Sequence, residues 1–282
     1  MRIGFIGAGL MGHGMAANLL KNGRHVSIIA HRNRAPIEDL VSKGASEAGS
    51  LQEMALNSDV IFLCLSTSEI VRDTISALKP GLRRGRIIID SGTSRPVATR
   101  QLAGELAELG IGYADAPMTG GPEQAALAEV GVLCGADPQT FEAIKPLLSC
   151  FASTVRHMGP VGSGHAAKLI SNYLVTGMIA LVAEAFATAR KADIDWRDLY
   201  EAMLNGSGNS GVLRKMVAPA LEGDFEGYKF AAANASKDIG YFMEFAMEFG
   251  AASQLASAVE KVFSDAVSRG LVDKNVSHLL KS

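Results

Sequence analysis

The sequence predicts a doubly wound α/β sheet followed by an all-helical C-terminal part, and two observations lead to this prediction. Up to about residue 158, short β-branched runs alternate with helical patterns, as in a mostly parallel sheet with helices between its strands. After His157 the β pattern stops, and apolar residues recur with the 3.6-residue period of helices. We therefore expect a sheet domain over residues 1–160 and a helical domain over 161–282.

Six runs in the first half have the length and composition of buried strands. They are RIGFI (2–6), HVSIIA (25–30), DVIFLCL (59–65), RIIID (86–90), IGYADA (111–116) and VGVLCGAD (130–137). Helical periodicity in the second half predicts helices near 164–191, 196–205, 212–221, 236–249 and 254–269. The first of these would be roughly 40 Å long at 1.5 Å per residue, so we expect it to join the two domains, with the active site in a cleft beside it.

Composition excludes several classes of function. The formal net charge is −2, which gives no electrostatic footprint for nucleic acid or an anionic membrane. The longest uncharged run, from Leu169 to Ala183, is shorter than the roughly 18 to 20 residues of a membrane span. Three widely spaced cysteines fit neither a disulfide framework nor a zinc site, and no metal is expected. The first strand begins almost at Met1, so we expect a cytoplasmic protein.

The first strand runs directly into a glycine motif, GAGLMG (7–12), that opens a helical pattern. Gly7 permits a tight turn, Gly9 lets the backbone approach a pyrophosphate, and Gly12 allows close packing of strand and helix. In this strand–turn–helix context the motif predicts a Rossmann-type dinucleotide site, whereas the same glycines elsewhere would indicate only a tight turn. His13, one residue further on, is interpreted as a structural residue of the helix surface.

The end of the second strand predicts which dinucleotide binds. Sites that prefer NAD place an acid there, but no acid lies between Gly12 and Glu38 in this sequence. His31, Arg32 and Arg34 instead offer positive charge where a 2′-phosphate would lie. NADP(H) is therefore the preferred cofactor and NAD(H) remains possible; the alternative for each of these residues is a solvated basic turn.

Three further segments carry candidate chemistry. Lys168 and Asn172 lie four residues apart on a helix, so they share one face, although a snorkelling lysine beside a satisfied polar residue has the same spacing. DAPMTGG (115–121) follows a strand end, where backbone N–H groups and Thr119 could hold a small carboxylate, unless the glycines form an ordinary turn. Lys237 begins a helix, where the dipole does not favour a cation and a ligand would explain it, as would an exposed surface pair.

Together these segments resemble the β-hydroxyacid dehydrogenase family, which includes 3-hydroxyisobutyrate dehydrogenase and tartronate semialdehyde reductase. The resemblance spans nearly the whole chain. It depends on GFIGAGLMGHGMAANLL (4–20), DAPMTGG (115–121), GSGHAAKLISNYL (162–174) and FAAANASKD (230–238), in that order and spacing. It implies a Rossmann domain and a helical domain joined by a long helix, associated as homodimers or homotetramers.

The resemblance also implies roles for individual residues. Lys168 corresponds to the catalytic lysine and Asn172 to the asparagine that orients the substrate, and both contact it. Thr119, Gly120 and Gly121 match the loop that holds the substrate carboxylate, and Lys237 lines the cofactor and substrate end of the site. The remaining implied cofactor contacts are Gly7, Gly9, Leu10, Met11, Gly12, His31, Arg32, Leu65, Thr93 and Phe230.

Four departures from the family pattern bear on specificity. Ser171 stands where asparagine is common, Thr119 and Gly92 where serine is usual, and Ala30–His31 where Asn–Arg is common. Ser171 and Thr119 keep polar character, but Gly92 is expected to enlarge the pocket wall, which leaves the identity of the substrate open.

The expected reaction is hydride transfer between the nicotinamide and a small β-hydroxy acid or semialdehyde, with Lys168 as the general acid or base. His165, beside the lysine, is an alternative acid, a phosphate contact or a helix cap. An imine reductase or a non-catalytic NADPH-binding protein shares the architecture, but the lysine argues against both. Oxidative decarboxylation, as in 6-phosphogluconate dehydrogenases, would require more phosphate-binding basic residues. The apolar segment 239–252 predicts that the chain self-associates.

Overall fold

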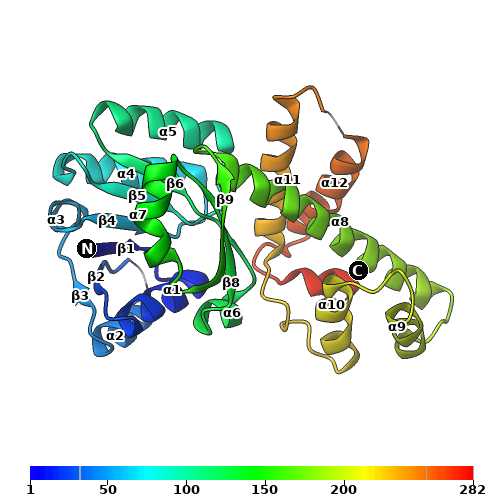
Figure 1. The fold of residues 1–282 in the computed structure, drawn as a ribbon. Helices are drawn as coiled ribbons and strands as arrows, with labels where there is room; N and C mark the ends of the chain where they lie inside the picture. The colour runs from blue at the N-terminus through cyan, green and yellow to red at the C-terminus, as the bar shows by residue number, and fades with distance from the viewer. Residues whose placement is uncertain (32, 252, 282) are drawn as a thin grey trace. The chain divides into compact units, whose positions relative to one another are not determined.

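The computed structural model describes residues 1–31, 33–251 and 253–281, and its chain divides into two compact units, Met1–Lys168 and Leu169–Ser282. The boundary between the units falls inside one long helix, α8 (Ser163–Lys191). The first unit is a sheet flanked by helices and the second is helical, as the element labels of Figure 1 show. The predicted fold class is confirmed.

A parallel sheet forms the centre of the first unit. Its strands lie in the order β3-β2-β1-β4-β5-β6-β8-β7 within the described residues, and β9 pairs with β8. The six predicted strands are present as β1 (Arg2–Ile6), β2 (His25–Ile28), β4 (Val60–Leu63), β5 (Ile87–Asp90), β6 (Gly112–Asp115) and β8 (Val130–Gly135). Short strands β3 (Ser46–Glu47) and β7 (Met118–Thr119) and the longer β9 (Ala152–Gly159) complete the sheet.

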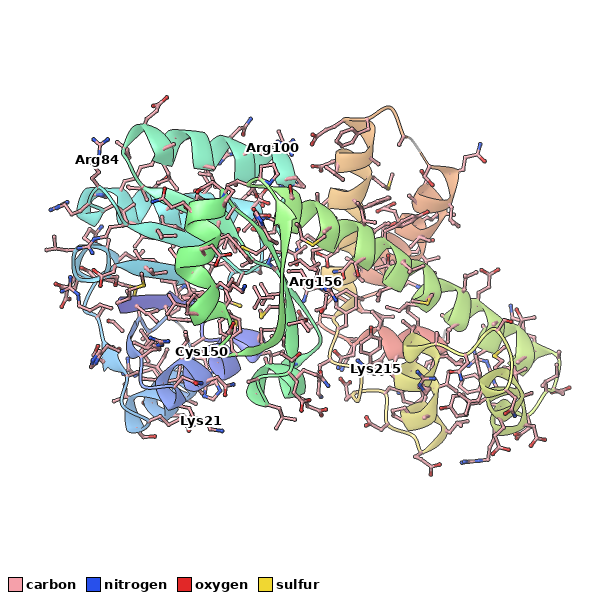
Figure 2. The ribbon with its side chains drawn as sticks, in the orientation of Figure 1. Lys21, Arg84, Arg100, Cys150, Arg156 and Lys215 are labelled. Carbon is pink, nitrogen blue, oxygen red and sulfur yellow. The ribbon has the colours of Figure 1, made fainter. Side chains whose placement is uncertain are left out.

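Neighbouring residues of the central strands point to opposite faces, and both faces are covered. Phe5 and Phe62 pack on one face, whereas Ile61 and Leu63 belong to the core on the other. This alternation follows from the two-residue period of a strand, and it explains why the strands are apolar throughout. Charged side chains such as those of Lys21 and Arg84 point outward from this unit (Figure 2).

Helices connect the strands, and several begin at a side-chain cap. Ser50, Thr67 and Asp137 each accept a hydrogen bond from a backbone N–H in the first turn of the helix that follows. The helices of this unit are α1 (Leu10–Lys21), α2 (Ala35–Ser42), α3 (Leu51–Asn57), α4 (Ser68–Leu78), η1 (Lys79–Gly81), α5 (Pro96–Glu108), α6 (Pro122–Ala126) and α7 (Pro138–Leu148).

The strand β9 was not predicted. In the described part of the chain it pairs with β8 alone, and most of its residues keep some exposed surface, so its sequence ASTVRHMG carries polar side chains instead of a continuous apolar run. The sheet also departs from a fully parallel arrangement, because β8 runs antiparallel to both β6 and β7.

The second unit contains the rest of α8 and the helices that pack around it. These are α9 (Trp196–Leu204), α10 (Gly211–Leu221), α11 (Ala232–Met247), α12 (Gln254–Ser268) and η2 (Val276–Lys281). Their shared core includes Ile179, Phe186, Met216, Ile239 and Phe263. The predicted helices are all present, but α11 begins at Ala232 rather than 236.

Within the described residues, α8 alone is long and apolar enough to cross a membrane, judged by length and composition. Its most apolar window has a mean hydropathy of 1.6, and 39% of that window is buried inside the protein. The helix is therefore longer than the uncharged run from Leu169 to Ala183, whose length was the basis for expecting no membrane span. Core helices of soluble proteins meet the same criterion, so this composition by itself identifies no membrane span.

Candidate active site

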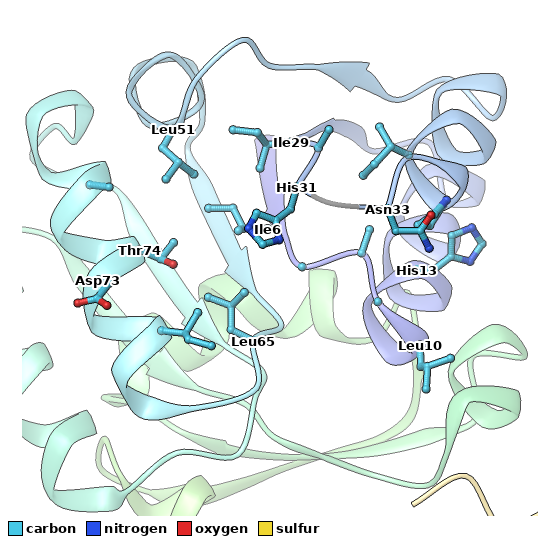
Figure 3. A pocket seen from close by; sticks show the side chains of 18 residues that line it. Ile6, Leu10, His13, Ile29, His31, Asn33, Leu51, Leu65, Asp73 and Thr74 are labelled. Atoms are coloured by element: carbon cyan, nitrogen blue, oxygen red, sulfur yellow. The ribbon is translucent and has the colours of Figure 1, made fainter. Parts of the chain in front are cut away.

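A pocket of about 1040 Å³ opens in the first unit at the carboxyl ends of β1, β2 and β4 (Figure 3). The strand order reverses here, since β1 lies between β2 and β4. Doubly wound sheets bind ligands at such a switch point. The lining residues are Ile6, Gly7, Ala8, Gly9, Leu10, His13, Ile29, Ala30, His31, Asn33, Pro36, Ile37, Leu51, Leu65, Ile70, Asp73, Thr74 and Ala77.

The glycine loop has the geometry that a pyrophosphate requires. Gly7 adopts φ +100°, and a Cβ there would lie 2.2 Å from the carbonyl oxygen of Cys64. A Cβ at Gly12 would lie 2.0 Å from the carbonyl oxygen of Gly7. At Gly9, by contrast, a Cβ would meet nothing within 4 Å, so the backbone faces open space at the start of α1. The loop is thus a cradle in which an anion could lie against the helix N-terminus.

Five of the predicted cofactor residues line this pocket: Gly7, Gly9, Leu10, His31 and Leu65. Two others do not line it: Gly12 is buried, and Met11 is partly buried and packs against the core. Thr93 follows β5 and is partly buried. Arg32 lies outside the described residues.

The contacts of the basic turn after β2 differ from those that its sequence predicts. Arg34 donates to both carboxylate oxygens of Glu47, at 3.1 and 3.0 Å, and also pairs with Glu38 at 3.5 Å. The hydrogen bond to Glu47 is the main cause that raises the pKa of Arg34 above its usual value. Strand pairing of β2 with β3 brings this acid to the turn. Arg34 therefore pairs with two carboxylates, and its contribution of positive charge to a 2′-phosphate stays a prediction.

The predicted carboxylate loop leaves the sheet at β7. The Thr119 hydroxyl is partly exposed and lies 3.4 Å from the carbonyl oxygen of Gly131. Gly120 adopts φ +105°, which favours glycine. The N–H of Gly121 already donates to Oε1 of Gln124 at 2.9 Å. The hydroxyl of Thr119 is thus a better candidate for holding a carboxylate than the N–H of Gly121.

Gly92 does not enlarge a pocket wall. A Cβ at this position would lie 2.5 Å from the carbonyl oxygen of Leu65 and 3.1 Å from Oδ1 of Asp90. The position is closed by backbone, so the glycine allows the segment after β5 to pack against the segment after β4. The expectation drawn from the family pattern was wrong on this point.

Asp90, Asp115 and His165 form a buried polar cluster at the carboxyl ends of β5 and β6 and the start of α8. Asp90 and Asp115 are register partners at the ends of β5 and β6. The imidazole of His165 lies between them, with Nε2 3.8 Å from Asp90 and Nδ1 3.8 Å from Asp115. All three side chains are fully buried. We call this group the strand-end cluster.

Each acid of the strand-end cluster holds one candidate segment in place. Asp90 accepts from the backbone N–H of Gly92 and from the Ser94 hydroxyl, both at 2.9 Å. Asp115 accepts from the backbone N–H groups of Gly162 and His165, both at 2.7 Å, and so caps the start of α8. Burial raises the pKa of Asp115, although His165 and these N–H groups oppose the shift.

His165 is part of this framework and not an exposed reagent. Its Nδ1 lies 2.8 Å from the hydroxyl of Thr99, and its side chain has no exposed surface. The interpretations of His165 as a catalytic acid or a phosphate contact are therefore wrong. This cluster was not predicted, although the sequence carries an acid at the carboxyl end of both strands: Asp90 is the last residue of RIIID, and Asp115 is the residue before the last in IGYADA.

Lys168 and Asn172 both lie on α8, four residues apart and thus on one face of the helix. Lys168 is half-buried. The buried amide of Asn172 donates to Oδ2 of Asp238 at 2.6 Å. Oδ1 of the same carboxylate lies 2.8 Å from Nζ of Lys237.

We call Asn172, Lys237 and Asp238 the helical cluster. The prediction that Lys237 begins a helix is wrong, because it is the sixth residue of α11; the lysine is paired with an acid, and its side chain is 17% exposed. Phe230 lies just before α11 and packs against the core of the second unit, and its carbonyl accepts from the N–H of Val276. Among the described residues no group of three or more His, Cys, Asp or Glu side chains could hold a metal ion.

Comparison with known proteins identifies the family. Residues 2–159 match the NAD binding domain of 6-phosphogluconate dehydrogenase, and residues 162–282 match the NAD-binding domain of NADP-dependent 3-hydroxyisobutyrate dehydrogenase. The chain belongs to the β-hydroxyacid dehydrogenase family. It is 32% identical to 2-(hydroxymethyl)glutarate dehydrogenase from Eubacterium barkeri over 288 residues, which cover 100% of this chain and 94% of the relative.

Solved structures agree with this β-hydroxyacid dehydrogenase assignment. A 3-hydroxyisobutyrate dehydrogenase from Salmonella typhimurium matches with a TM-score of 0.90 and 27% identity, over 100% of this chain and 99% of the other. An imine reductase from Pseudomonas sp. shares the fold with a TM-score of 0.63 and 19% identity, over 99% and 98% of the two chains. The protein is thus an NAD(P)-dependent oxidoreductase of hydroxyacids.

Proposed function

We propose that this dehydrogenase uses NADP(H) to interconvert a small β-hydroxy acid and the corresponding semialdehyde or keto acid. The proposal depends on the position of Lys168 on α8, in a chain whose glycine loop faces open space at the switch point of the sheet. The cofactor supplies the hydride acceptor or donor when bound. The residues of the chain bind, orient and transfer the proton.

Lys168 is proposed as the proton donor in reduction. Arrival of a hydride at a carbonyl carbon places negative charge on the oxygen, and an ammonium group within hydrogen-bond reach stabilises that charge and then donates its proton. An unperturbed lysine has a pKa of about 10.4, so it is protonated at neutral pH. In the oxidative direction the same amine would have to act as the base.

Asn172 is proposed as the residue that aligns the substrate or the lysine. Its amide nitrogen donates one hydrogen bond to Asp238, which fixes the plane of the amide. The amide oxygen and the second hydrogen are then presented in a constant direction. Thr119 is proposed to hold the carboxylate of the substrate, so that the reacting atoms meet in a productive orientation.

Preference for NADP(H) rests on the absence of an acid at the end of β2. His31 lies at this edge of the pocket, and Arg32 follows it in the sequence. Because Arg34 is held by Glu47, the number of cations that face a 2′-phosphate is smaller than the sequence indicates. NAD(H) is therefore proposed as a weaker second cofactor.

We also propose that the chain forms homodimers or homotetramers. Ile170, Leu174 and Leu181 are 54–65% exposed and follow one another at helical spacing along α8. Met247, the last residue of α11, is 69% exposed, and Phe249, which follows the helix, is 70% exposed. Exposed apolar side chains in a contiguous stripe are typical of interfaces between protein chains. Light scattering at micromolar concentrations would test this, and a monomeric mass would contradict it.

The central test is the substitution Lys168→Met, which keeps the length of the side chain and removes the ammonium group. We expect kcat to fall by about a hundredfold or more, with NADPH affinity within about twofold of the parent. Substrates would be a panel of small semialdehydes and glyoxylate, assayed with NADPH and NADH. Lys191→Met, at the exposed C-terminal end of the same helix, is the matched control and should leave kcat unchanged. Turnover of Lys168→Met within a few-fold of the parent would refute the role of the lysine.

A further inference from the structure

The short helix α6 follows the candidate carboxylate loop directly, and its contacts fix where that loop lies. Thr119, Gly120 and Gly121 lead from β7 to α6, which begins at Pro122. At one end of the loop, β7 pairs with β8, and Thr119 lies opposite Gly131. At the other end, α6 packs against α1, the helix that follows the glycine loop (Figure 1). The loop is therefore held between the sheet and the helix of the candidate dinucleotide site.

Asn18, on α1, makes the polar part of the contact with α6. Its side chain is buried, and its amide nitrogen donates to the carbonyl oxygens of Ala125 and Ala126 at 2.9 and 3.1 Å. The same nitrogen donates to the carbonyl oxygen of Gly14 at 2.9 Å, one turn back along α1. The last carbonyl groups of a helix have no partner within that helix. Asn18 therefore supplies hydrogen-bond donors to the C-terminal end of α6.

Gly14 lets the two helices approach closely enough for these hydrogen bonds. A Cβ at this position would lie 2.7 Å from the carbonyl carbon of Ala125 and 2.8 Å from the backbone nitrogen of Ala126. Backbone atoms cannot move aside as the end of a flexible side chain can, so a larger residue would displace α6. Gly14 and Asn18 lie four residues apart, on one face of α1. We call these two residues the α6 contact pair.

The helix α1 thus connects two candidate binding elements. Its first turn follows Gly9, where the backbone faces open space and a pyrophosphate could lie. Its next two turns carry the α6 contact pair, and α6 follows the loop that contains Thr119. A carboxylate held by Thr119 would orient the carbonyl carbon for hydride transfer only if this loop keeps its place relative to the cofactor. The contact of α1 with α6 determines that place.

We propose that Gly14 and Asn18 are positioning residues for the carboxylate of the substrate: through α6 they set the place of Thr119 relative to the glycine loop. They act through α6 and not by contact with the substrate. This inference rests on the proposed role of Thr119 in holding the carboxylate. A change at either residue weakens the binding of carboxylate substrates and spares the binding of NADPH, because the glycine loop and the first turn of α1 are unchanged.

Two variants test the α6 contact pair in different ways. Asn18→Leu keeps the approximate size of the side chain and removes its N–H donors, so the end of α6 loses their hydrogen bonds. Gly14→Ala keeps the asparagine and adds a Cβ that displaces α6. It also favours the helical conformation of α1, because alanine is a better helix former than glycine. A loss shared by both variants therefore comes from the position of α6 and not from a weakened α1.

The measurement compares the best carboxylate substrate of the semialdehyde and glyoxylate panel with the methyl ester of the same compound. For both variants we expect kcat/KM for the carboxylate to fall by about tenfold, mostly through KM, because a hydrogen bond to a charged group is weakened in the ground state and the transition state alike. The value of kcat/KM for the ester and the dissociation constant of NADPH should stay within about twofold of the parent. A general loss of stability would instead lower activity with acid and ester alike.

Asn22→Leu is the matched control for the loss of an asparagine from α1. The amide of Asn22 donates to the carbonyl oxygen of Asn18 at 2.9 Å and to that of Cys150, after α7, at 3.3 Å. This substitution removes a donor from the same helix that bonds beyond the end of α7 instead of to α6, so KM for the carboxylate should stay within about twofold of the parent. Thr119→Val is the reference for the loss of the carboxylate contact itself, and it should raise KM at least as much as Asn18→Leu.

Three results would overturn the inference, and they can be told apart. If Thr119→Val raises KM but Asn18→Leu and Gly14→Ala do not, the contact with α6 is ordinary packing, and the proposed role of Thr119 stands. If Thr119→Val leaves KM unchanged, the proposed role of Thr119 fails and the inference fails with it. Equal losses with the acid and the ester, or weaker binding of NADPH, would assign the α6 contact pair to the stability of the fold or to the cofactor site.

Discussion

The two buried polar clusters of this dehydrogenase are built from different kinds of donor. In the strand-end cluster, Asp90 and Asp115 accept mainly from backbone N–H groups and short hydroxyls, which the sheet and the start of α8 fix in place. In the helical cluster, Asp238 accepts from the side chains of Asn172 and Lys237. Backbone donors cannot turn toward a ligand, but a lysine and an amide can.

This difference separates the residues that stabilise the fold from those that are proposed to contact the substrate. The strand-end cluster joins the segment that carries Thr93, the strand that leads to the Thr119 loop and the start of the helix that carries Lys168. We expect its loss to appear first in stability. The helical cluster contains residues proposed to meet the substrate, and we expect its loss to appear first in turnover.

The largest effect is expected for Asp115→Ala. This change removes the acceptor of two buried backbone N–H groups and the cap of α8. Each unsatisfied buried donor costs about 1–3 kcal/mol, so the free energy of unfolding should fall by roughly 3–5 kcal/mol. Urea denaturation measures it. As a control, Asp137→Ala removes an ordinary cap at α7 and should cost about 1 kcal/mol; equal losses in the two variants would remove the basis for the comparison.

A smaller effect, of a different kind, is expected for Asp238→Asn. The neutral amide no longer holds Lys237 by charge and disturbs the donor pairing of Asn172. We expect kcat/KM for the substrate to fall by about tenfold, equivalent to about 1.4 kcal/mol in the transition state. Unfolding should be affected less than in Asp115→Ala. The exposed pair of Lys261 and Asp265 supplies the control, because Asp265→Asn should leave both quantities unchanged. A variant destabilised as much as Asp115→Ala, with normal kcat/KM, would show that the helical cluster is framework too.

The smallest effect concerns Cys134, which is buried near Asp115. Burial, and then the charge of Asp115, raises the pKa of this thiol to about 12. At pH 8 the thiolate is then about one part in ten thousand, and it is the thiolate that reacts. Iodoacetamide should therefore leave Cys134 unmodified in the native enzyme, as peptide mass analysis would show, and modify it after denaturation. Rapid native labelling at pH 8 would mean that this region of the sheet opens readily.

Much of the fold was predictable because local chemistry and tertiary structure agree. Strands such as Val60–Leu63, buried on both faces, are apolar at every position, and the glycine motif directly follows the first strand. β9 could not be recognised, because a strand paired on one side keeps polar residues. The start of α11 at Ala232 was missed since its first turn, AANA, carries no capping side chain.

The candidate site was predictable where residues are close in sequence and not where the sheet brings them together. Lys168 and Asn172 follow from helical spacing. The pairing of Arg34 with Glu47 depends on strand register, and that of His165 with Asp115 links residues 50 positions apart. Gly92 was misread because the closed space around it is created by Leu65, on a neighbouring segment. The contact of His13 with Asp39 could not be predicted for the same reason, because Asp39 is on another helix.

The boundary between the two units falls within α8, between Lys168 and Leu169, and not in a loop. A helix advances about 1.5 Å and turns about 100° per residue, so the offset between Lys168 and Asn172 is set by the backbone: about 6 Å along the axis and slightly more than one full turn. A single inserted or deleted residue here would swing one of them a quarter-turn or more out of alignment. Loops elsewhere in the chain tolerate changes of length, but helix geometry fixes the four-residue spacing between Lys168 and Asn172. We therefore expect related sequences to vary the side chains between these two residues but not the number of residues.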